Sequence, residues 1–513
     1  MKSKIPIFLV LVAALFVRIY LIVRDSVPFA YDMGRDLLWA KDISFYHIPT
    51  LIGPAASIWG VYFGPLWYYF LSIPLLISGG HPLSAVFFTA STIILTGALA
   101  YFLFFKYIGK QLAFILAIII LFSAALINIS TFAFHANLLP LLTLLTIYFS
   151  FLAIVKNPLC ISLSFLFVSL MFHADPAPAV VFTFFPIIIF IIFKLYKKRP
   201  VQTLLSSLVL YLVPFLPQIL FELRNDFIQT KSLIAYFSGN NPSLSGQLPV
   251  VERFFNRIQV FFEFFTSSFS PENILLSTVL IILIIFGAVK INTSRFKNEL
   301  KILFNINLTA LILSFLIFTF PITVEIKTWY LYGLPIVFAF QITLAIVAIR
   351  KFHKLIPIFI IVFLLVNLKP LLFRNSEALK SDPALLSNQI EAIKFIESDS
   401  EGIDYTVYVY TPTIYDYSYQ YLFWWQGKVK KIRFPQEFAY LPGQPSYVRN
   451  KNFYTVDPEE TDIVYLIIEE NQENEFYTKE NWLKNFESYQ LAWENNINGA
   501  IKIQKREKCK YLS

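Results

Sequence analysis

Eleven long apolar stretches constrain this chain more than any other feature of its sequence. A helix of about 20 apolar residues crosses the hydrocarbon core of a bilayer. The stretches cover residues 5–23, 83–105, 111–128, 137–155, 158–173, 176–193, 201–220, 273–290, 302–321, 329–349 and 355–373. With 57% hydrophobic and only 15% charged residues, the chain is predicted to be an α-helical polytopic membrane protein with about eleven spans.

The charges divide the chain into two regions of opposite sign. Residues 1–374 hold 27 Lys and Arg against 12 Asp and Glu, whereas residues 375–513 hold 15 against 21. We therefore predict a transmembrane domain over 1–374 and a soluble α/β domain over 375–513. For the second domain the sequence predicts a helix that starts at 381–383 and strands at 405–410, 463–468 and 500–503.

Basic residues indicate the orientation of the chain. They lie in short clusters between the apolar stretches, which is typical of cytoplasmic membrane loops and not of a nucleic-acid-binding protein. The parity of the clusters requires that Gly64–Ser78, a short aromatic segment, lies at the outer interface without crossing. We then expect a multi-pass protein of the cell membrane with a cytoplasmic N-terminus. The loops 24–82 and 221–272 and the C-terminal domain are expected outside, and 5–23 is expected to be a retained span.

The first outer loop carries the acidic segment Tyr31-Asp32-Met33-Gly34-Arg35-Asp36. On a helix, Asp32 and Asp36 would share one face, with Arg35 beside them. A carboxylate next to a span can act as a general base, because partial desolvation raises its pKa towards neutrality. The same spacing also fits solvated loop charges, which are the more frequent case.

Several other outer residues are candidates for binding a substrate. Cations that could bind a phosphate are Arg224, Lys231, Arg253, Arg257 and Lys327. Lys327 precedes Trp329-Tyr330, so this segment could contact a headgroup or simply anchor at the interface. Polar candidates at the outer rim are Asn137, His173 and Asp175, for which hydrogen bonding or helix capping is the alternative role. The aromatic residues 415–421 and 424–425 could stack on sugars or pack the C-terminal domain against the membrane rim.

Metal ions and cofactors are not predicted from these residues. The outer histidines, which include His135 and His173, match no known spacing of metal ligands. Cys160 and Cys509 are too few and too far apart for a disulfide framework or a metal site.

The order of elements around the acidic segment resembles that of GT-C membrane glycosyltransferases. A single span, an acidic motif and then Pro65-Leu66-Trp67-Tyr68-Tyr69 are similar to the bacterial relatives of protein O-mannosyltransferases and of the aminoarabinose transferase acting on lipid A, which are family 39-like. In that family an Asp-Glu motif follows the first span, and its Asp is the catalytic base. The motif is Asp32-Met33 here, so Asp32 inherits the role of base, the second acid is missing, and Asp36 is its candidate substitute.

The resemblance implies a glycosyltransferase that acts at the outer face. A sugar would pass, with inversion, from a polyprenyl-phosphate carrier to a hydroxyl of a protein, lipid or polysaccharide acceptor, without a metal. Alternatives are an O-antigen-type ligase or polymerase, a lipid-linked sugar transporter or flippase, and a non-enzymatic membrane anchor. Transporters place ionisable residues at the midplane of their spans. The predicted spans are almost free of charge between their ends, which favours an enzyme.

Overall fold

The chain folds into two compact units in the computed structural model, which describes residues 5–25, 27–238, 248–293, 296–322, 325–347, 354–375, 380–430, 433–444, 461–469 and 477–509. Unit 1 comprises Met1–Ile19, Thr50–Trp67 and Phe87–Phe373. Unit 2 comprises Tyr20–Pro49, Tyr68–Val86 and Arg374–Ser513. Two parts of the first predicted outer loop therefore belong to the same unit as the C-terminal segment.

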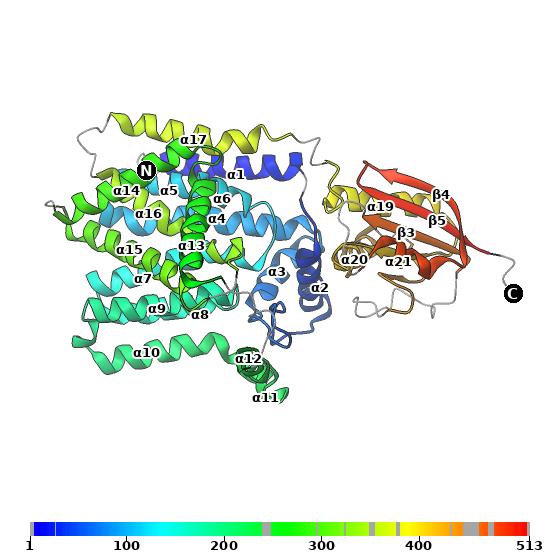
Figure 1. The fold of residues 1–513 in the computed structure, drawn as a ribbon, viewed down its shortest axis with the longest axis horizontal. Coiled ribbons are helices and arrows are strands. Elements are labelled where there is room, and N and C mark those ends of the chain that lie inside the picture. The colour runs from blue at the N-terminus through cyan, green and yellow to red at the C-terminus, as the bar shows by residue number, and fades with distance from the viewer. Residues whose placement is uncertain are drawn as a thin grey trace. The chain divides into compact units, whose positions relative to one another are not determined.

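All eleven apolar stretches form helices (Figure 1). Seven helical segments are long and apolar enough to span a membrane: Ile5–Arg24, Leu83–Ile108, His135–Val155, Pro200–Arg224, Ile274–Thr293, Asn298–Thr319 and Leu355–Leu372. The other stretches form the shorter helices α5 (Lys110–Phe122), α8 (Ile161–Met171), α9 (Pro176–Ile192) and α16 (Leu334–Ala345). The polytopic α-helical class is thus confirmed, while the number of crossings stays a prediction.

The other helices formed by the apolar stretches are α1 (Ile5–Asp25), α4 (Leu83–Ile108), α6 (Ala124–Asn128), α7 (Leu139–Val155), α10 (Pro200–Leu212), α14 (Ile274–Thr293), α15 (Asn298–Thr319) and α17 (Leu355–Leu372). Helices α14 and α16 approach each other closely where Gly287 faces Ala345. The space between these two residues has no room for a Cβ atom on Gly287. Small residues at a helix crossing allow this kind of packing in membranes.

The predicted outer loop 221–272 is largely helical. It contains the end of α11 (Leu216–Arg224), then α12 (Ile228–Ser238) and α13 (Val250–Phe269). Helix α13 packs against α15 in unit 1 and runs across its direction (Figure 1). Its buried residues recur every three or four positions, from Arg253 and Arg257 to Phe261 and Phe264, so it is an amphipathic helix with one buried face.

One buried charge lies within a predicted span. Arg18 of α1 is fully buried and donates hydrogen bonds to the Ala14 carbonyl at 3.0 Å, to the Leu121 carbonyl at 3.1 Å and to the Ser130 hydroxyl at 2.9 Å. The guanidinium therefore has protein partners in place of water, as a buried charge requires. Arg18 is an exception to the expectation that the spans carry almost no charge between their ends.

Unit 2 contains a five-stranded mixed sheet with the order β2-β1-β3-β5-β4. The strands are β1 (Thr406–Tyr410), β2 (Phe438–Ala439), β3 (Ile463–Glu469), β4 (Tyr489–Ile497) and β5 (Ile501–Lys508). Strand β1 pairs in parallel with β2 and β3, whereas β5 pairs antiparallel with β3 and β4. Three of the strands match the predicted ones, and the mixed sheet confirms the α/β character of the C-terminal domain.

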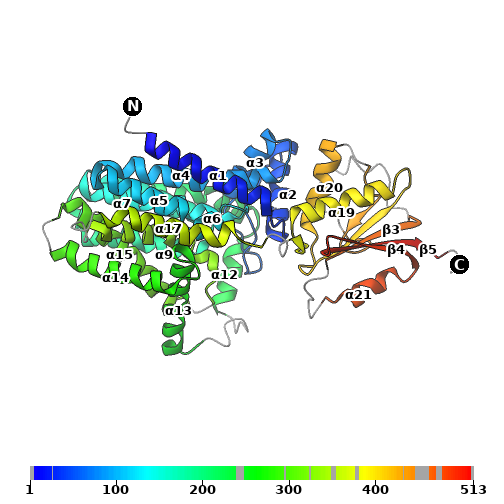
Figure 2. The ribbon, with the colours of Figure 1, turned by 90° about the horizontal axis from the view of Figure 1, so that it is seen from above.

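Helices cover both faces of this sheet. Helix α19 (Leu386–Asp399) lies on one face and α21 (Lys479–Leu483) on the other (Figure 2). On the α21 side, Trp482 and Phe486 pack on alternate residues of β1 and β3 in a shared apolar core. The helix predicted to start at 381–383 begins at Leu386, because the Asp382 side chain accepts a hydrogen bond from Ala384 N at 2.9 Å and forms a turn first.

Residues 27–29, in the first predicted outer loop, join the C-terminal segment through their backbone. Phe29 N donates to the Ala384 carbonyl at 2.6 Å, and Leu386 N donates to the Val27 carbonyl at 2.8 Å. Next in the chain come α2 (Tyr31–Tyr46) and α3 (Leu66–Ile77), and α2 packs against α20 (Tyr417–Lys430). This packing holds the helix that carries the acidic segment.

Candidate active site

The acidic segment forms the first turns of α2. The helix begins after Ala30, whose extended backbone makes it the N-cap, and ends at His47 in the left-handed region with φ 54°. Asp32 lies in the first turn, where a carboxylate interacts favourably with the helix dipole. The prediction that Asp32, Arg35 and Asp36 lie on a helix is confirmed.

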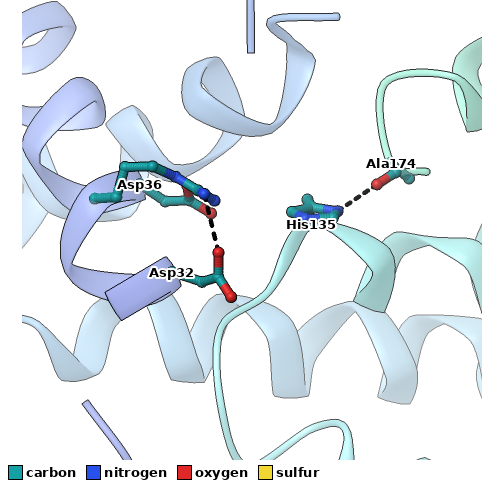
Figure 3. Close-up of polar contacts among 5 residues, drawn as sticks. Asp32, Asp36, His135 and Ala174 are labelled. Carbon is teal, nitrogen blue, oxygen red and sulfur yellow. Dashed lines mark hydrogen bonds and ion pairs between the residues drawn. The ribbon is translucent and has the colours of Figure 1, made fainter. Parts of the chain in front are cut away.

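Arg35 binds both carboxylates of this segment, those of Asp32 and Asp36, which are labelled in Figure 3. Its Nη1 lies 2.9 Å from Asp32 Oδ1, and its Nη2 and Nε lie 2.8 and 2.9 Å from Asp36 Oδ1. The two acids differ in exposure, because the Asp32 side chain is 50% exposed and that of Asp36 only 1%. Asp32 is therefore the acid that a substrate can reach, and Asp36 is the buried counterion of Arg35.

Electrostatics keep Arg35 charged in this position. Burial acts to lower the pKa of its guanidinium, but Asp36, Tyr68 and Asp32 together outweigh burial and raise it. Tyr68 of α3 is buried as well, and burial together with Asp36 raises the pKa of its phenol well above the ordinary value. The Tyr68 ring stacks on Trp39 with an interplanar angle of 7°. Arg35, next to Asp32, is thus a fixed cation whose buried counterion is Asp36.

The C-terminal helix α20 fixes the other side of α2. Gly34 lies so close to α20 that a Cβ atom would be 2.5 Å from Ser418 N. Further along, Trp424 Nε1 donates to the Tyr46 hydroxyl at 2.7 Å. Lys41 is fully buried, lies 2.5 Å from Asp42 and faces the Tyr46 ring. The aromatic residues of α20 therefore pack against α2 within unit 2, a contact that sequence reasoning did not predict.

His173 and Asp175 lie in unit 1, between α8 and α9. The His173 Nε2–H group donates to the Pro214 carbonyl at 3.0 Å, while Nδ1 accepts from Leu66 N at 3.3 Å. This pattern requires a neutral imidazole, and burial lowers the His173 pKa to about 4. Asp175 caps α9 by accepting from Ala177 N at 2.9 Å, and burial raises its pKa to about 7. Both residues thus have local structural partners.

His135 and Asn137 occupy the short 3-10 helix His135–Leu138 that precedes α7. His135 Nδ1 donates to the Ala174 carbonyl (Figure 3). Asn137 is fully buried and donates to the Phe132 carbonyl at 2.9 Å, but its Oδ1 has no hydrogen-bond partner among the described residues. Asn137 does not cap α7, because the N-cap position is Leu138.

The candidate phosphate-binding cations differ sharply in burial. Arg224 is exposed at the end of α11, and Lys327 is 44% exposed and paired with Glu325. By contrast, Arg253 and Arg257 of α13 are only 6% and 3% exposed. Tyr330, in the 3-10 helix Thr328–Leu331, is half-buried.

The two buried arginines lie one helical turn apart on α13. Arg257 Nε donates to the Phe318 carbonyl at 3.1 Å and its Nη1 to Asn256 Oδ1 at 2.9 Å. Arg253 Nε has no hydrogen-bond partner among the described residues. Burial and the like charge of Arg253 lower the pKa of Arg257. Two buried cations whose charges repel each other form a site that an anion would stabilise.

Metal ligands do not gather anywhere in the described part of the chain. No group of three or more His, Cys, Asp and Glu side chains there could hold a metal ion.

The chain thus combines apolar helices that could span a membrane, a helical acidic segment and a C-terminal mixed sheet, and its fold is similar to that of solved membrane proteins of GT-C architecture. The particular structures that the chain resembles are two crystal structures of ArnT from Cupriavidus metallidurans, in the apo state and bound to undecaprenyl phosphate. They match with a TM-score of 0.60 and 10% and 11% identity, over 98% of both chains. The oligosaccharyltransferase of Archaeoglobus fulgidus, in a complex with zinc and sulfate, matches with a TM-score of 0.47 and 13% identity, over 96% of this chain and 72% of that chain. No family model and no curated protein matches the sequence.

Proposed function

We propose that this protein is an inverting glycosyltransferase that moves a sugar from a polyprenyl-phosphate carrier to an acceptor hydroxyl. The observation that carries the proposal is Asp32, a half-exposed carboxylate held at 2.9 Å by a buried arginine on a helix outside the spans. The shared fold with ArnT, which was crystallised with undecaprenyl phosphate, supports the choice of donor class.

In the proposed reaction Asp32 accepts the proton of the acceptor hydroxyl. The freed oxygen attacks the anomeric carbon from the face opposite the phosphate, and the bond between that carbon and the phosphate oxygen breaks. The electron pair leaves with the carrier phosphate, so no covalent enzyme intermediate forms. Arg35 fixes the Asp32 carboxylate in one orientation, and Asp36 balances the charge of Arg35 within the protein.

The leaving phosphate needs cations in a poorly hydrated environment. Arg253 and Arg257 are the best candidates in unit 1, because both are buried and Arg253 Nε lacks a hydrogen-bond partner among the described atoms. Arg224 and Lys327, which the sequence also suggested, are more exposed, and Lys327 is already paired with Glu325. We therefore assign the carrier phosphate to the arginine pair of α13.

The transporter alternative is less well supported. A transporter needs ionisable groups that change partners near the midplane of its spans. Arg18 is the buried charge found in such a position, and its three hydrogen bonds to Ala14, Leu121 and Ser130 give it a structural role.

A sugar-transfer assay in proteoliposomes with a panel of polyprenyl-phosphate sugars tests the proposal. Asp32→Asn keeps the shape of the side chain but removes the proton acceptor, so kcat should fall about 100-fold or more. Glu401→Gln, which neutralises an exposed acid elsewhere in unit 2, should leave kcat unchanged. Near wild-type turnover in Asp32→Asn would exclude Asp32 as the base.

Asp36→Asn is a different kind of variant and needs a separate measurement. It leaves the buried Arg35 with only the half-exposed Asp32 as a counterion. Breaking a buried ion pair typically destabilises a protein by about 3–5 kcal/mol. We expect Asp36→Asn to lower the thermal stability clearly, while Asp32→Asn should change it little.

A further inference from the structure

Three tyrosines from distant parts of the sequence gather beside Asp32. Tyr31, its neighbour in α2, lies with its ring centroid 4.9 Å from that of Tyr417 and 6.3 Å from that of Tyr415. Tyr415 and Tyr417 are themselves stacked, with centroids 5.6 Å apart and an angle of 21° between the rings. We refer to these three residues as the tyrosine cluster.

One ring of the cluster, that of Tyr415, is exposed, whereas Tyr31 and Tyr417 are half-buried. Tyr415 is 40% exposed, more than any other aromatic side chain in the described residues from 380 to 509. On α20 the later aromatic residues, such as Trp424 and Tyr421, are at most 4% exposed. The Tyr415 ring therefore offers an aromatic face to a ligand, next to the half-buried rings of Tyr31 and Tyr417.

The position of the cluster relative to Asp32 is fixed by close packing. Gly34 touches the backbone of Ser418, directly after Tyr417, and no larger residue fits there. The guanidinium of Arg35 lies over the Tyr31 ring, 5.6 Å from its centroid, while it also holds Asp32. The same arginine therefore orients both the candidate base and one ring of the cluster.

The charges around the cluster restrict what it can bind. Arg35 is neutralised by Asp32 and Asp36, and Asp416, between Tyr415 and Tyr417 in the chain, is a further buried acid. Three carboxyl groups against one cation do not favour an anionic ligand. Exposed aromatic faces with phenol hydroxyls instead suit a neutral ring that has an apolar face and polar edges.

We propose that the tyrosine cluster is an acceptor subsite that binds a neutral pyranose ring, so that the acceptor is a glycan or glycolipid sugar. This inference rests on the proposed function, because it takes Asp32 as the base. One face of the acceptor ring stacks on Tyr415, and the ring presents a hydroxyl to Asp32, which is adjacent to Tyr31 in the chain. The C-terminal domain then contributes directly to acceptor recognition.

Ligand binding can be tested without any turnover. The full-length protein in nanodiscs is mixed with neutral methyl pyranosides, with a Ser/Thr-containing peptide or with a sugar phosphate, and saturation transfer from aromatic protons to each probe is measured by NMR. We expect transfer to the methyl pyranosides. In Tyr415→Ala their affinity should fall about two- to tenfold, which is the range of one aromatic stacking contact.

Matched variants separate stacking from folding. Tyr415→Trp should retain binding, and Tyr415→Leu should lose it, because leucine preserves apolar volume without an aromatic face. Leu491→Ala removes another exposed apolar side chain, on the edge strand β4, and should have no effect. Equal binding in wild type, Tyr415→Ala and Tyr415→Leu would overturn the subsite, as would saturation transfer to the peptide or the sugar phosphate alone.

The outcome is independent of the proposed reaction. In the Asp32→Asn background, binding of methyl pyranosides should still depend on Tyr415, because the stacking contact does not involve the carboxylate. If binding depends on Tyr415 but Asp32→Asn keeps its turnover, the subsite stands and the base assignment fails. If Asp32→Asn loses turnover and Tyr415 variants bind normally, the glycosyltransferase stands and the acceptor subsite fails.

Discussion

At the scale of single residues, Asp32 and Asp36 show what spacing can and cannot reveal. Their i, i+4 spacing and the adjacent Arg35 predicted a shared helical face, and the structure confirms the helix. Which acid is exposed was not predictable, because Asp36 is buried near Tyr68 of α3, a residue 32 positions further along the chain. The separation of roles thus depends on tertiary packing.

The buried arginines of α13 lead to a prediction at the same scale. If Arg253 and Arg257 bind the carrier phosphate, Arg253→Gln should raise the apparent KM for the polyprenyl-phosphate sugar. The loss of a charge-assisted hydrogen bond corresponds to about 1.5–3 kcal/mol, or roughly 10- to 150-fold. Donor titrations in proteoliposomes measure this change.

Arg224→Gln is the matched control for this experiment, because Arg224 is exposed at the end of α11. Its donor KM should change less than twofold, as expected for a solvated charge. If Arg224→Gln raises the donor KM more than Arg253→Gln does, the phosphate site would have to be assigned to α11 and not to α13.

At the scale of elements, the amphipathic helix α13 and the edge strand β4 were the hardest to predict from the sequence. Helix α13 was interpreted as loop because its sequence mixes phenylalanines with charged residues. Strand β4 was missed because five of its nine residues are exposed on the edge of the sheet, and its apolar signal is weak. By contrast, β1 and β3 lie in the centre of the sheet and were predicted from their apolar β-branched and aromatic residues.

The contact between α2 and α20 yields a second prediction. Gly34→Ala places a Cβ atom 2.5 Å from Ser418 N, and backbone at such a short distance must move. We expect a loss of stability of about 1–3 kcal/mol, together with reduced sugar transfer because α2 carries Asp32. Thermal unfolding and the transfer assay measure the two effects.

Ala30→Ser should have the opposite effect on stability, because it adds a capping side chain to the same helix. Ala30 is an exposed N-cap with an extended backbone and no capping side chain, so a serine hydroxyl can accept a hydrogen bond there. Such a cap stabilises by about 1 kcal/mol. If Gly34→Ala were as stable as wild type, tight packing between α2 and α20 would not hold the acidic segment.

Two buried acids predict how the stability of unit 2 depends on pH. Burial raises the pKa of Asp416 to about 6 and that of Glu469 to about 7, although Tyr419 and Gln389 donate hydrogen bonds to Glu469. Between about pH 4 and 7 the folded state therefore binds more protons than the unfolded state, and stability falls as pH rises. We expect Tm to be about 3 °C or more lower at pH 7.5 than at pH 5.

Glu469→Gln should flatten this dependence, because the amide oxygen can still accept from Tyr419 and the group no longer titrates. The measurement is thermal unfolding of the full-length protein in nanodiscs at both pH values, followed by tryptophan fluorescence. Glu401→Gln, an exposed position, should keep the wild-type slope. A Glu469→Gln slope equal to the wild-type slope would show that Glu469 ionises normally in the folded protein.

At the scale of the whole molecule, the orientation inferred from the basic clusters remains a prediction. It places the Lys194–Arg199 cluster in the cytoplasm and the C-terminal domain outside. Lys198 and Glu401 are both exposed and lie on opposite sides in this arrangement. In a variant with Cys160→Ser and Cys509→Ser, a membrane-impermeant maleimide should label Glu401→Cys in intact cells and Lys198→Cys only after permeabilisation. The reverse pattern would invert the topology.

The arginine of α1 has a consequence for how the chain is made. Arg18 takes two of its three hydrogen-bond acceptors from Leu121 and Ser130, which follow it by 103 and 112 residues. The ribosome therefore delivers α1 well before those partners exist. An arginine at the centre of a lone span costs about 2.5–3.5 kcal/mol to insert. The two hydrogen bonds that offset this cost can form only after the segment from α5 to Ser130 has been synthesised, so the packing of α1 is coupled to the synthesis of later helices.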